Sequence, residues 1–296
     1  MSNLIDFSNA LTSAVEKGGA STVLVNARKR YPASGIAYTE DLILTADHVV
    51  TREDIKVVTP DGRSLSATVA GRDPGSDLAV LRLTDKVLTP AQTSNEIKVG
   101  QLVLALGRPN LAGMQASWGI VTAIAGPTRT QRGGLLDEYV LTETTPYPGF
   151  SGGPLINTEG EVLGLNTSGL TQGSSLTIPV KVAWRIADAL AKHGSVKRGY
   201  LGVRTQPVEI PEAARTSLKR DQSSGLLVLW LEENGPAQKG GLFVGDTLVA
   251  IGGQHVSDPD DLFAALNSDT VGKAVAVEVL RGGKPETVNV TVSERK

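Results

Sequence analysis

The sequence predicts a mostly β chain with two domains, a larger antiparallel β domain and a smaller α+β domain. Three observations support this prediction: a long series of short strand-like runs, one helix-like segment that follows the series, and a remainder in which strands and helices mix. A chain of 296 residues is long enough for two domains that each bury a core. We expect these domains at residues 1–195 and 196–296.

An amphipathic helix is expected at the start of the chain. Leu4, Phe7, Leu11 and Val15 recur at helical spacing, and the glycine pair at 18–19 ends the pattern. The apolar face of this helix has two possible partners, the rest of its own domain or another subunit.

Strand-like runs follow from Ser21 onward, rich in valine, isoleucine, leucine and threonine and separated by turns such as Asp61-Gly62. The expected strands are residues 22–26, 35–38, 41–45, 55–59, 64–70, 78–83, 102–106, 117–124, 139–145, 161–167 and 175–178. Many short strands without intervening helices indicate an antiparallel barrel or sandwich.

A helix closes this domain. Pro179 suits its first position, Val182, Ile186 and Leu190 share one face, and Gly194 ends it. The second domain is expected to contain strands at 226–231, 247–251, 274–281 and 287–292 and helices at 236–239 and 260–266, with Asp258 capping the last helix.

Composition excludes several classes of protein. A net charge of −2 with scattered basic residues gives no case for nucleic-acid binding, and the absence of cysteine excludes disulfides, thiolate metal sites and a cysteine nucleophile. The first residues carry no basic segment followed by a long apolar one, so we expect neither a signal peptide in the chain as written nor a transmembrane segment. We expect a cytoplasmic protein as the chain is written; the alternative is a periplasmic or extracytoplasmic protein whose signal was removed.

The stretch Pro-Gly-Phe-Ser-Gly-Gly-Pro-Leu at residues 148–155 is the most informative one. Its prolines and glycines prevent a helix, so it is expected to form a tight loop that presents a serine hydroxyl together with backbone N–H groups. The alternative is an ordinary turn in which Ser151 has no chemical role.

His48 is the candidate base among three histidines. It follows the apolar run 42–44, near the end of a strand embedded in the core, whereas His193 and His255 are expected on the surface. A catalytic histidine needs a carboxylate that fixes its tautomer.

Asp77 is the candidate carboxylate. It begins the apolar run 78–83, where an unpaired carboxylate would be costly to bury. Asp47 is a poorer candidate because the side chain of a residue directly adjacent to the histidine generally points another way.

The order His48, Asp77, Ser151 on a β-rich chain is that of the chymotrypsin-like catalytic triad. The nucleophile elbow of α/β-hydrolases also matches Gly-Phe-Ser-Gly-Gly, but it requires a helix directly after the serine. The sequence Gly152-Gly153-Pro154 forbids that helix.

Three motifs resemble those of the HtrA/DegP serine proteases: Leu-Thr-Ala-Asp-His-Val-Val at 44–50, Asp-Pro-Gly-Ser-Asp-Leu-Ala-Val-Leu at 73–81, and residues 148–155. Ile-Pro-Val at 178–180 and Arg-Gly-Tyr-Leu-Gly-Val at 198–203 resemble the junction of that family into its PDZ domain. The resemblance covers nearly the whole chain.

This resemblance implies a chymotrypsin-like double β-barrel protease domain followed by one PDZ domain. It implies Ser151 as nucleophile, His48 as general base and then acid, and Asp77 as its orienting partner, with the N–H groups of Gly149 and Ser151 as the oxyanion hole. An ATP-independent endopeptidase without metal or cofactor, acting on unfolded or damaged polypeptides, is therefore expected. The family also implies a homotrimer formed through the N-terminal segment, where Phe7 offers an aromatic contact.

The sequence departs from the family pattern next to the nucleophile, where Phe150 stands in place of the usual asparagine. A proteolytically inactive chaperone or peptide-binding scaffold is therefore the alternative. The loop at 26–34 is much shorter than the regulatory loop of DegP-like members, which argues against large cage assemblies. The specificity pocket, expected to take a small or medium apolar side chain, is assigned to Pro146, Asn166, Ser168, Gly169 and Leu170.

The C-terminal domain resembles a bacterial PDZ domain through Gly-Leu-Leu-Val at 225–228, Asn-Gly-Pro-Ala at 234–237 and Gly-Leu-Phe-Val-Gly-Asp at 241–246. Its carboxylate-binding loop is assigned to Tyr200, Leu201, Gly202 and Val203, with Arg198 helping to hold the C-terminal carboxylate of a bound peptide. Without the resemblance to the family, the alternative is that residues 200–203 only begin a strand and have no role in binding.

Overall fold

The computed structural model describes residues 2–130, 134–170, 176–197, 199–266 and 268–294. The chain forms two compact units, Met1–Val196 and Lys197–Lys296. Both units are built mainly from antiparallel strands, which confirms the mostly β fold expected from the sequence.

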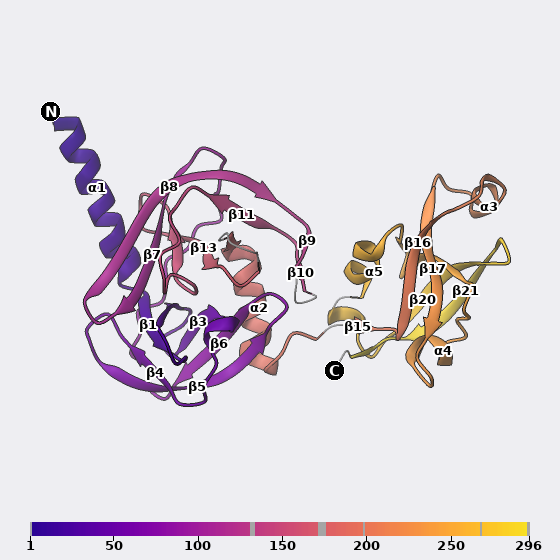
Figure 1. Ribbon diagram of the computed structural model, residues 1–296, viewed down its shortest axis with the longest axis horizontal. Coiled ribbons are helices and arrows are strands. Elements are labelled where there is room, and N and C mark those ends of the chain that lie inside the picture. The colour runs from indigo at the N-terminus through magenta and orange to yellow at the C-terminus, as the bar shows by residue number, and fades with distance from the viewer. Residues whose placement is uncertain (1, 131–133, 171–175, 198, 267, 295–296) are drawn as a thin grey trace. The chain divides into compact units, whose positions relative to one another are not determined.

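The first unit contains two closed antiparallel β-barrels (Figure 1). The strands of the first barrel are β1 (Thr22–Asn26), β2 (Ala33–Ala37), β3 (Leu42–Ala46), β4 (Ile55–Val58), β5 (Ser64–Asp73) and β6 (Leu78–Leu83). Within the described residues they pair around the barrel in the order β1-β2-β3-β6-β5-β4. Neighbours along the chain are mostly neighbours in the sheet, as short hairpin connections dictate.

The second barrel has the order β11-β14-β13-β12-β7-β8 in the described part of the chain. Its strands are β7 (Leu102–Asn110), β8 (Gly113–Ala125), β11 (Tyr139–Thr142), β12 (Pro154–Ile156), β13 (Val162–Thr167) and β14 (Leu176–Pro179). Strands β9 (Thr128–Arg129) and β10 (Leu135–Leu136) form a separate two-stranded antiparallel sheet. The expected strand at 139–145 ends earlier, at Thr142. Closure into barrels excludes the sandwich that the strand pattern alone left open.

Helix α2 (Val180–His193) packs against both barrels. Its residues Ala183, Ala187 and Leu190 share one buried cluster with Leu44 of the first barrel and Leu165 of the second. The helix ends where Gly194 takes a left-handed conformation (φ 77°) and donates its N–H to the carbonyl of Leu190.

Helix α1 (Ser2–Gly19) is buried at its C-terminal end and exposed at its N-terminal end. Ala14 is 1% exposed and Leu11 packs against the same cluster as α2, whereas Leu4, Ile5 and Phe7 are 76%, 61% and 43% exposed. In Figure 1 the N-terminal turns extend away from the barrels. Part of the apolar face is thus satisfied within its own unit, and part is left uncovered.

The second unit is a twisted sheet flanked by short helices. Its strands are β15 (Gly199–Tyr200), β16 (Val203–Glu209), β17 (Ser224–Leu231), β18 (Thr247–Ile251), β19 (Gln254–His255), β20 (Ala274–Arg281), β21 (Lys284–Thr291) and β22 (Ser293–Glu294). Its helices are α3 (Glu212–Leu218), α4 (Pro236–Lys239) and α5 (Pro259–Ala265), with a 3₁₀ turn η2 (Ser268–Thr270). The cap expected at Asp258 is present, since its side chain accepts from the N–H groups of Asp260 and Asp261.

The sequence pattern does not predict helix α3, which the structure contains. Its sequence, Glu-Ala-Ala-Arg-Thr-Ser-Leu, buries Ala214 and carries no apolar repeat long enough to show a helical period. Among the described residues, none of the helices combines the length and apolar composition needed to cross a bilayer.

Candidate active site

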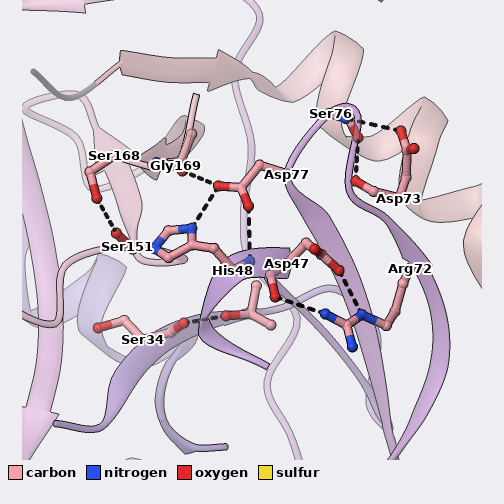
Figure 2. Close-up of polar contacts among 12 residues, drawn as sticks. Ser34, Asp47, His48, Arg72, Asp73, Ser76, Asp77, Ser151, Ser168 and Gly169 are labelled. Atoms are coloured by element: carbon pink, nitrogen blue, oxygen red, sulfur yellow. Dashed lines mark hydrogen bonds and ion pairs between the residues drawn. The ribbon is translucent and has the colours of Figure 1, made fainter. Parts of the chain in front are cut away.

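The side chains of His48, which follows β3, and Asp77, which precedes β6, face each other in Figure 2. β3 ends at Ala46, and His48 lies in a 3₁₀ turn, η1 (Asp47–Val49), rather than on the strand itself. Its Nδ1 lies 2.8 Å from Oδ2 of Asp77, whose side chain is fully buried. A carboxylate at this position fixes which ring nitrogen carries the proton and leaves Nε2 free to act as a base.

Asp77 is held in an unusual backbone conformation. Its φ of 56° lies in the left-handed region, which L-residues rarely adopt. The preceding turn is fixed by Asp73, whose carboxylate accepts from the N–H groups of Gly75 and Ser76. Such strain at a buried polar residue is typical of functional sites, where the surrounding structure imposes it.

Three donors compensate the buried Asp77 carboxylate. Oδ1 accepts from the backbone N–H of His48 at 2.9 Å, and Oδ2 accepts from both His48 Nδ1 and the hydroxyl of Thr167. Thr167 Oγ1 in turn accepts from the N–H of Gly169 at 3.0 Å. Charged groups are buried at tolerable cost when hydrogen bonds replace their hydration, so this network keeps the carboxylate in place.

Asp47 points away from the imidazole. Its Oδ1 accepts from Nε of Arg72 at 2.6 Å, and its backbone carbonyl accepts from the same guanidinium at 3.2 Å. The backbone N–H of Asp47 donates to the carbonyl of Asp77 at 2.9 Å. Asp47 therefore braces the turn that carries His48 instead of orienting its ring.

Ser151 lies beside the imidazole in Figure 2, on the loop between β11 and β12. Its Oγ lies 3.2 Å from Oγ of Ser168, so in this conformation the hydroxyl is paired with Ser168. Gly149 and Gly152 have φ values of 91° and 85°, which glycine adopts without steric cost. These two glycines allow the tight loop that the sequence predicted.

Around the serine, the backbone hydrogen bonds of residues 149–153 leave two N–H groups free in the described part of the chain. The N–H groups of Phe150, Gly152 and Gly153 donate to the carbonyls of Tyr147, Asn166 and Phe150. Within the described residues, those of Gly149 and Ser151 have no hydrogen-bond partner. Two unengaged donors beside a serine hydroxyl are what an oxyanion hole requires.

Phe150 anchors the loop in the core of the second barrel. It is 2% exposed and shares a buried cluster with Val103, Leu155 and Leu163. A Cβ atom on Gly107 would lie 2.4 Å from the Phe150 ring, so this glycine makes the room for it. The departure from the family pattern is thus accommodated by packing.

The residues assigned to the specificity pocket differ in burial. Pro146 and Ser168 are exposed, Gly169 is half-buried, and Asn166 and Leu170 are buried. Asn166 Oδ1 accepts from Thr177 Oγ1 at 2.7 Å, while its Nδ2 is buried without a hydrogen-bond partner among the described residues.

The loop assigned to peptide binding in the second unit lies between β15 and β16. Leu201 is buried with residues of α5, Tyr200 and Val203 are half-buried, and Gly202 has a φ of 75°. The carbonyls of Leu201 and Gly202 accept from the N–H groups of Ala237 and Glu232. Arg198 lies outside the described residues.

Two further residues contribute to the site, and no sequence motif marks them. Thr167 donates to Asp77, and Ser34 of β2 donates to the carbonyl of Gly149 at 2.7 Å. Their sequence contexts are ordinary strand contexts. Each is a polar residue inside an apolar strand, and such a residue needs a hydrogen-bond partner when it is buried.

The fold and the site are those of a trypsin-like peptidase domain followed along the chain by a PDZ domain. The trypsin-like peptidase domain family matches residues 33–165, and the PDZ domain family matches residues 199–292. The chain belongs to the HtrA/DegP family of trypsin-like serine proteases.

Curated relatives and solved structures agree with this assignment. The chain is 36% identical over 271 residues to a probable periplasmic DegP-like serine endoprotease of Brucella suis, and 38% identical over 276 residues to one of Halomonas elongata. These matches cover 88% and 90% of this chain but 52% and 57% of the relatives, so the chain spans about half their length.

Among solved structures, the HtrA-type protease AlgW with a bound decapeptide matches with a TM-score of 0.80 at 26% identity, covering 97% of this chain and 99% of that one. The serine endoprotease from Yersinia pestis matches with a TM-score of 0.79 at 27% identity, covering 97% and 98% of the two chains.

Proposed function

We propose that the chain is a serine endopeptidase in which Ser151, His48 and Asp77 form the catalytic triad. The observation that carries this proposal is the His48–Asp77 pair beside a serine whose loop leaves two N–H groups unengaged. The alternative of an inactive scaffold depended on Phe150, and that side chain is buried in the core of the second barrel, where it packs with Val103, Leu155 and Leu163.

In the proposed mechanism, His48 Nε2 accepts the proton of Ser151 as Oγ attacks the carbonyl carbon of the scissile peptide bond. The N–H groups of Gly149 and Ser151 stabilise the resulting oxyanion. Collapse breaks the C–N bond, and the amine leaves with the proton from His48. Water then hydrolyses the acyl-enzyme with His48 as base, and Asp77 stabilises the imidazolium in both steps.

Unfolded or damaged polypeptides are the proposed substrates. A peptide bond reaches Ser151 in an extended backbone, which unfolded chains supply more readily than folded ones. The PDZ domain is proposed to bind C-terminal peptides at residues 200–203, since successive backbone N–H groups around Gly202 suit a carboxylate. The peptide bound to AlgW supports a peptide ligand in this family.

Casein digestion tests the protease assignment. Wild-type protein is expected to degrade casein, and Ser151→Ala is expected to reduce turnover by at least about 10³-fold because the nucleophile is lost. Ser66→Ala, which changes an exposed serine of β5, is the matched control and should retain wild-type turnover. Equal turnover by wild type and Ser151→Ala would overturn the assignment.

We also propose a homotrimer assembled through the N-terminal turns of α1, where Leu4, Ile5 and Phe7 are exposed. Replacing Phe7 with glutamate should shift sedimentation equilibrium from trimer mass toward monomer mass, because a charge at an apolar contact is costly to bury. Asn9→Glu, a polar change on the same helix, should keep the wild-type mass. Monomeric wild-type protein would contradict the proposal.

A periplasmic location is proposed for the chain, because the named relatives are probable periplasmic proteases. The cytoplasmic location expected from the sequence has no support among these relatives.

A further inference from the structure

Ser34 connects the two barrels at the nucleophile loop. It lies on β2 of the first barrel and is fully buried. Its Oγ donates to the carbonyl of Gly149 at 2.7 Å, and its backbone N–H donates to the carbonyl of Ser151 at 3.2 Å. One residue of the first barrel therefore holds the carbonyls on both sides of Phe150 in the second.

The direction of the Ser34 hydroxyl proton is fixed by its surroundings. Ser34 Oγ accepts from the backbone N–H of Arg108 at 2.8 Å, which leaves its own proton for the Gly149 carbonyl. The Ser34 carbonyl accepts from Thr45 Oγ1 at 2.7 Å. These four hydrogen bonds engage both the backbone and the side chain of Ser34, so neither can turn without leaving a buried group unpaired.

These bonds fix two planar peptide units of the loop at both ends. In the unit that joins Gly149 to Phe150, the carbonyl accepts from Ser34 and the N–H donates to Tyr147. In the unit that joins Ser151 to Gly152, the carbonyl accepts from Ser34 and the N–H donates to Asn166. A planar unit held at its two ends cannot rotate, and the free N–H groups of Gly149 and Ser151 are each adjacent to such a unit.

We infer that Ser34 is a positioning residue that keeps the oxyanion hole formed through its hydrogen bonds to the nucleophile loop. Gly149 gives the loop the freedom to rotate its peptide groups, because glycine has no side chain to restrict φ and ψ. The Ser34 hydroxyl removes that freedom. The inference rests on the proposed protease function. In it, Ser34 positions the two N–H groups that stabilise the transition state and does not itself bind the substrate.

Ser34→Ala removes the hydroxyl and tests the inference. The Gly149 carbonyl and the Arg108 N–H lose their partner, and rotation of the Gly149–Phe150 unit becomes possible. Loss of one oxyanion donor costs about 10²- to 10³-fold in kcat, so a displaced donor pair should lower kcat by about 10- to 100-fold. KM for a short peptide substrate should stay within about twofold, because the donors act mainly in the transition state.

A peptide boronate provides the second measurement, since its tetrahedral adduct on Ser151 places an oxygen where the oxyanion forms. Its inhibition constant should rise by about the factor by which kcat/KM falls. Ser21→Ala is the matched control: Ser21 is also buried, and its hydroxyl bonds to the carbonyl of Gly18, away from the loop. It should lower the melting temperature comparably and leave kcat unchanged.

The possible outcomes separate the inference from the proposed function. If the wild type is active and Ser34→Ala has the same kcat and the same boronate affinity, the role of Ser34 is overturned. The proposed protease function then still stands. A loss of activity that Ser21→Ala reproduces at equal melting temperature also overturns it. If Ser34→Ala does not fold, Ser34→Cys retains a weak donor and should give an intermediate kcat; wild-type kcat in that variant would count against the inference.

Discussion

Gly169 shows how tightly the candidate dyad is enclosed. A Cβ atom at this position would lie 2.4 Å from Asp77 Oδ2 and 2.5 Å from His48 Nδ1, closer than real Cβ contacts allow. Glycine is therefore required by space, because its neighbours are the two groups whose hydrogen bond orients the base. The same residue donates its N–H to Thr167, which in turn donates to Asp77.

Gly169→Ala is expected to lower kcat by about 10- to 100-fold, because the methyl group must separate His48 from Asp77 or displace the segment that carries Thr167. General-base catalysis contributes about 10²- to 10⁴-fold, so a misoriented imidazole loses a substantial part of it. Steady-state kinetics on a short peptide substrate measures the effect. Gly19→Ala, where the nearest side-chain atom is 3.4 Å away, should keep the wild-type kcat; wild-type kcat in Gly169→Ala would refute the steric argument.

At the scale of elements, the loop between β11 and β12 depends on Phe150 for its place in the second barrel. This side chain fills the space above Gly107 and contacts the ring of Tyr147 edge-on, with centroids 5.4 Å apart. Because Phe150 lies directly between the two proposed oxyanion donors, the packing of one side chain links barrel stability to the shape of the site.

Phe150→Ala should destabilise the first unit by about 3–5 kcal/mol, through lost apolar burial and the cavity left behind. Urea unfolding followed by tryptophan fluorescence measures this free energy. Tyr31→Ala, which truncates an aromatic side chain that is 66% exposed, should change it by less than about 0.5 kcal/mol. A Phe150→Ala variant as stable as wild type would show that the loop is not anchored by this residue.

The sequence predicts elements better than contacts. Strand alternation, the helix between Pro179 and Gly194 and the Asp258 cap are local patterns, and all appear in the structure. The turn η1 was not expected, since it depends on the bond from the Asp47 N–H to the Asp77 carbonyl. The roles of Ser34 and Thr167 join residues 115 and 90 positions apart, a distance that no local pattern spans.

At the scale of the whole molecule, the two units have separate hydrophobic cores. Leu201, Leu248, Val277 and Val290 belong to a cluster formed entirely by the second unit. Arg281 also pairs there with Asp246, donating through Nε and Nη2 at 2.8 and 2.7 Å. In the described chain, the hydrogen bonds that hold His48, Asp77 and the nucleophile loop join residues of the first unit. We therefore expect each unit to fold by itself and to perform its proposed part.

Separate fragments should divide the two proposed activities. Residues 1–196 are expected to hydrolyse a short peptide substrate with kcat within about threefold of the full chain, since the hydrogen bonds described above for His48, Asp77 and the nucleophile loop join residues of the first unit. An inactive but folded first fragment would instead mean that the second unit is needed to form the catalytic geometry.

Residues 197–296 should unfold cooperatively and bind a peptide with a free apolar C-terminus, as measured by calorimetry. Amidation of that C-terminus should abolish binding, because it removes the carboxylate that the N–H groups around Gly202 would hold.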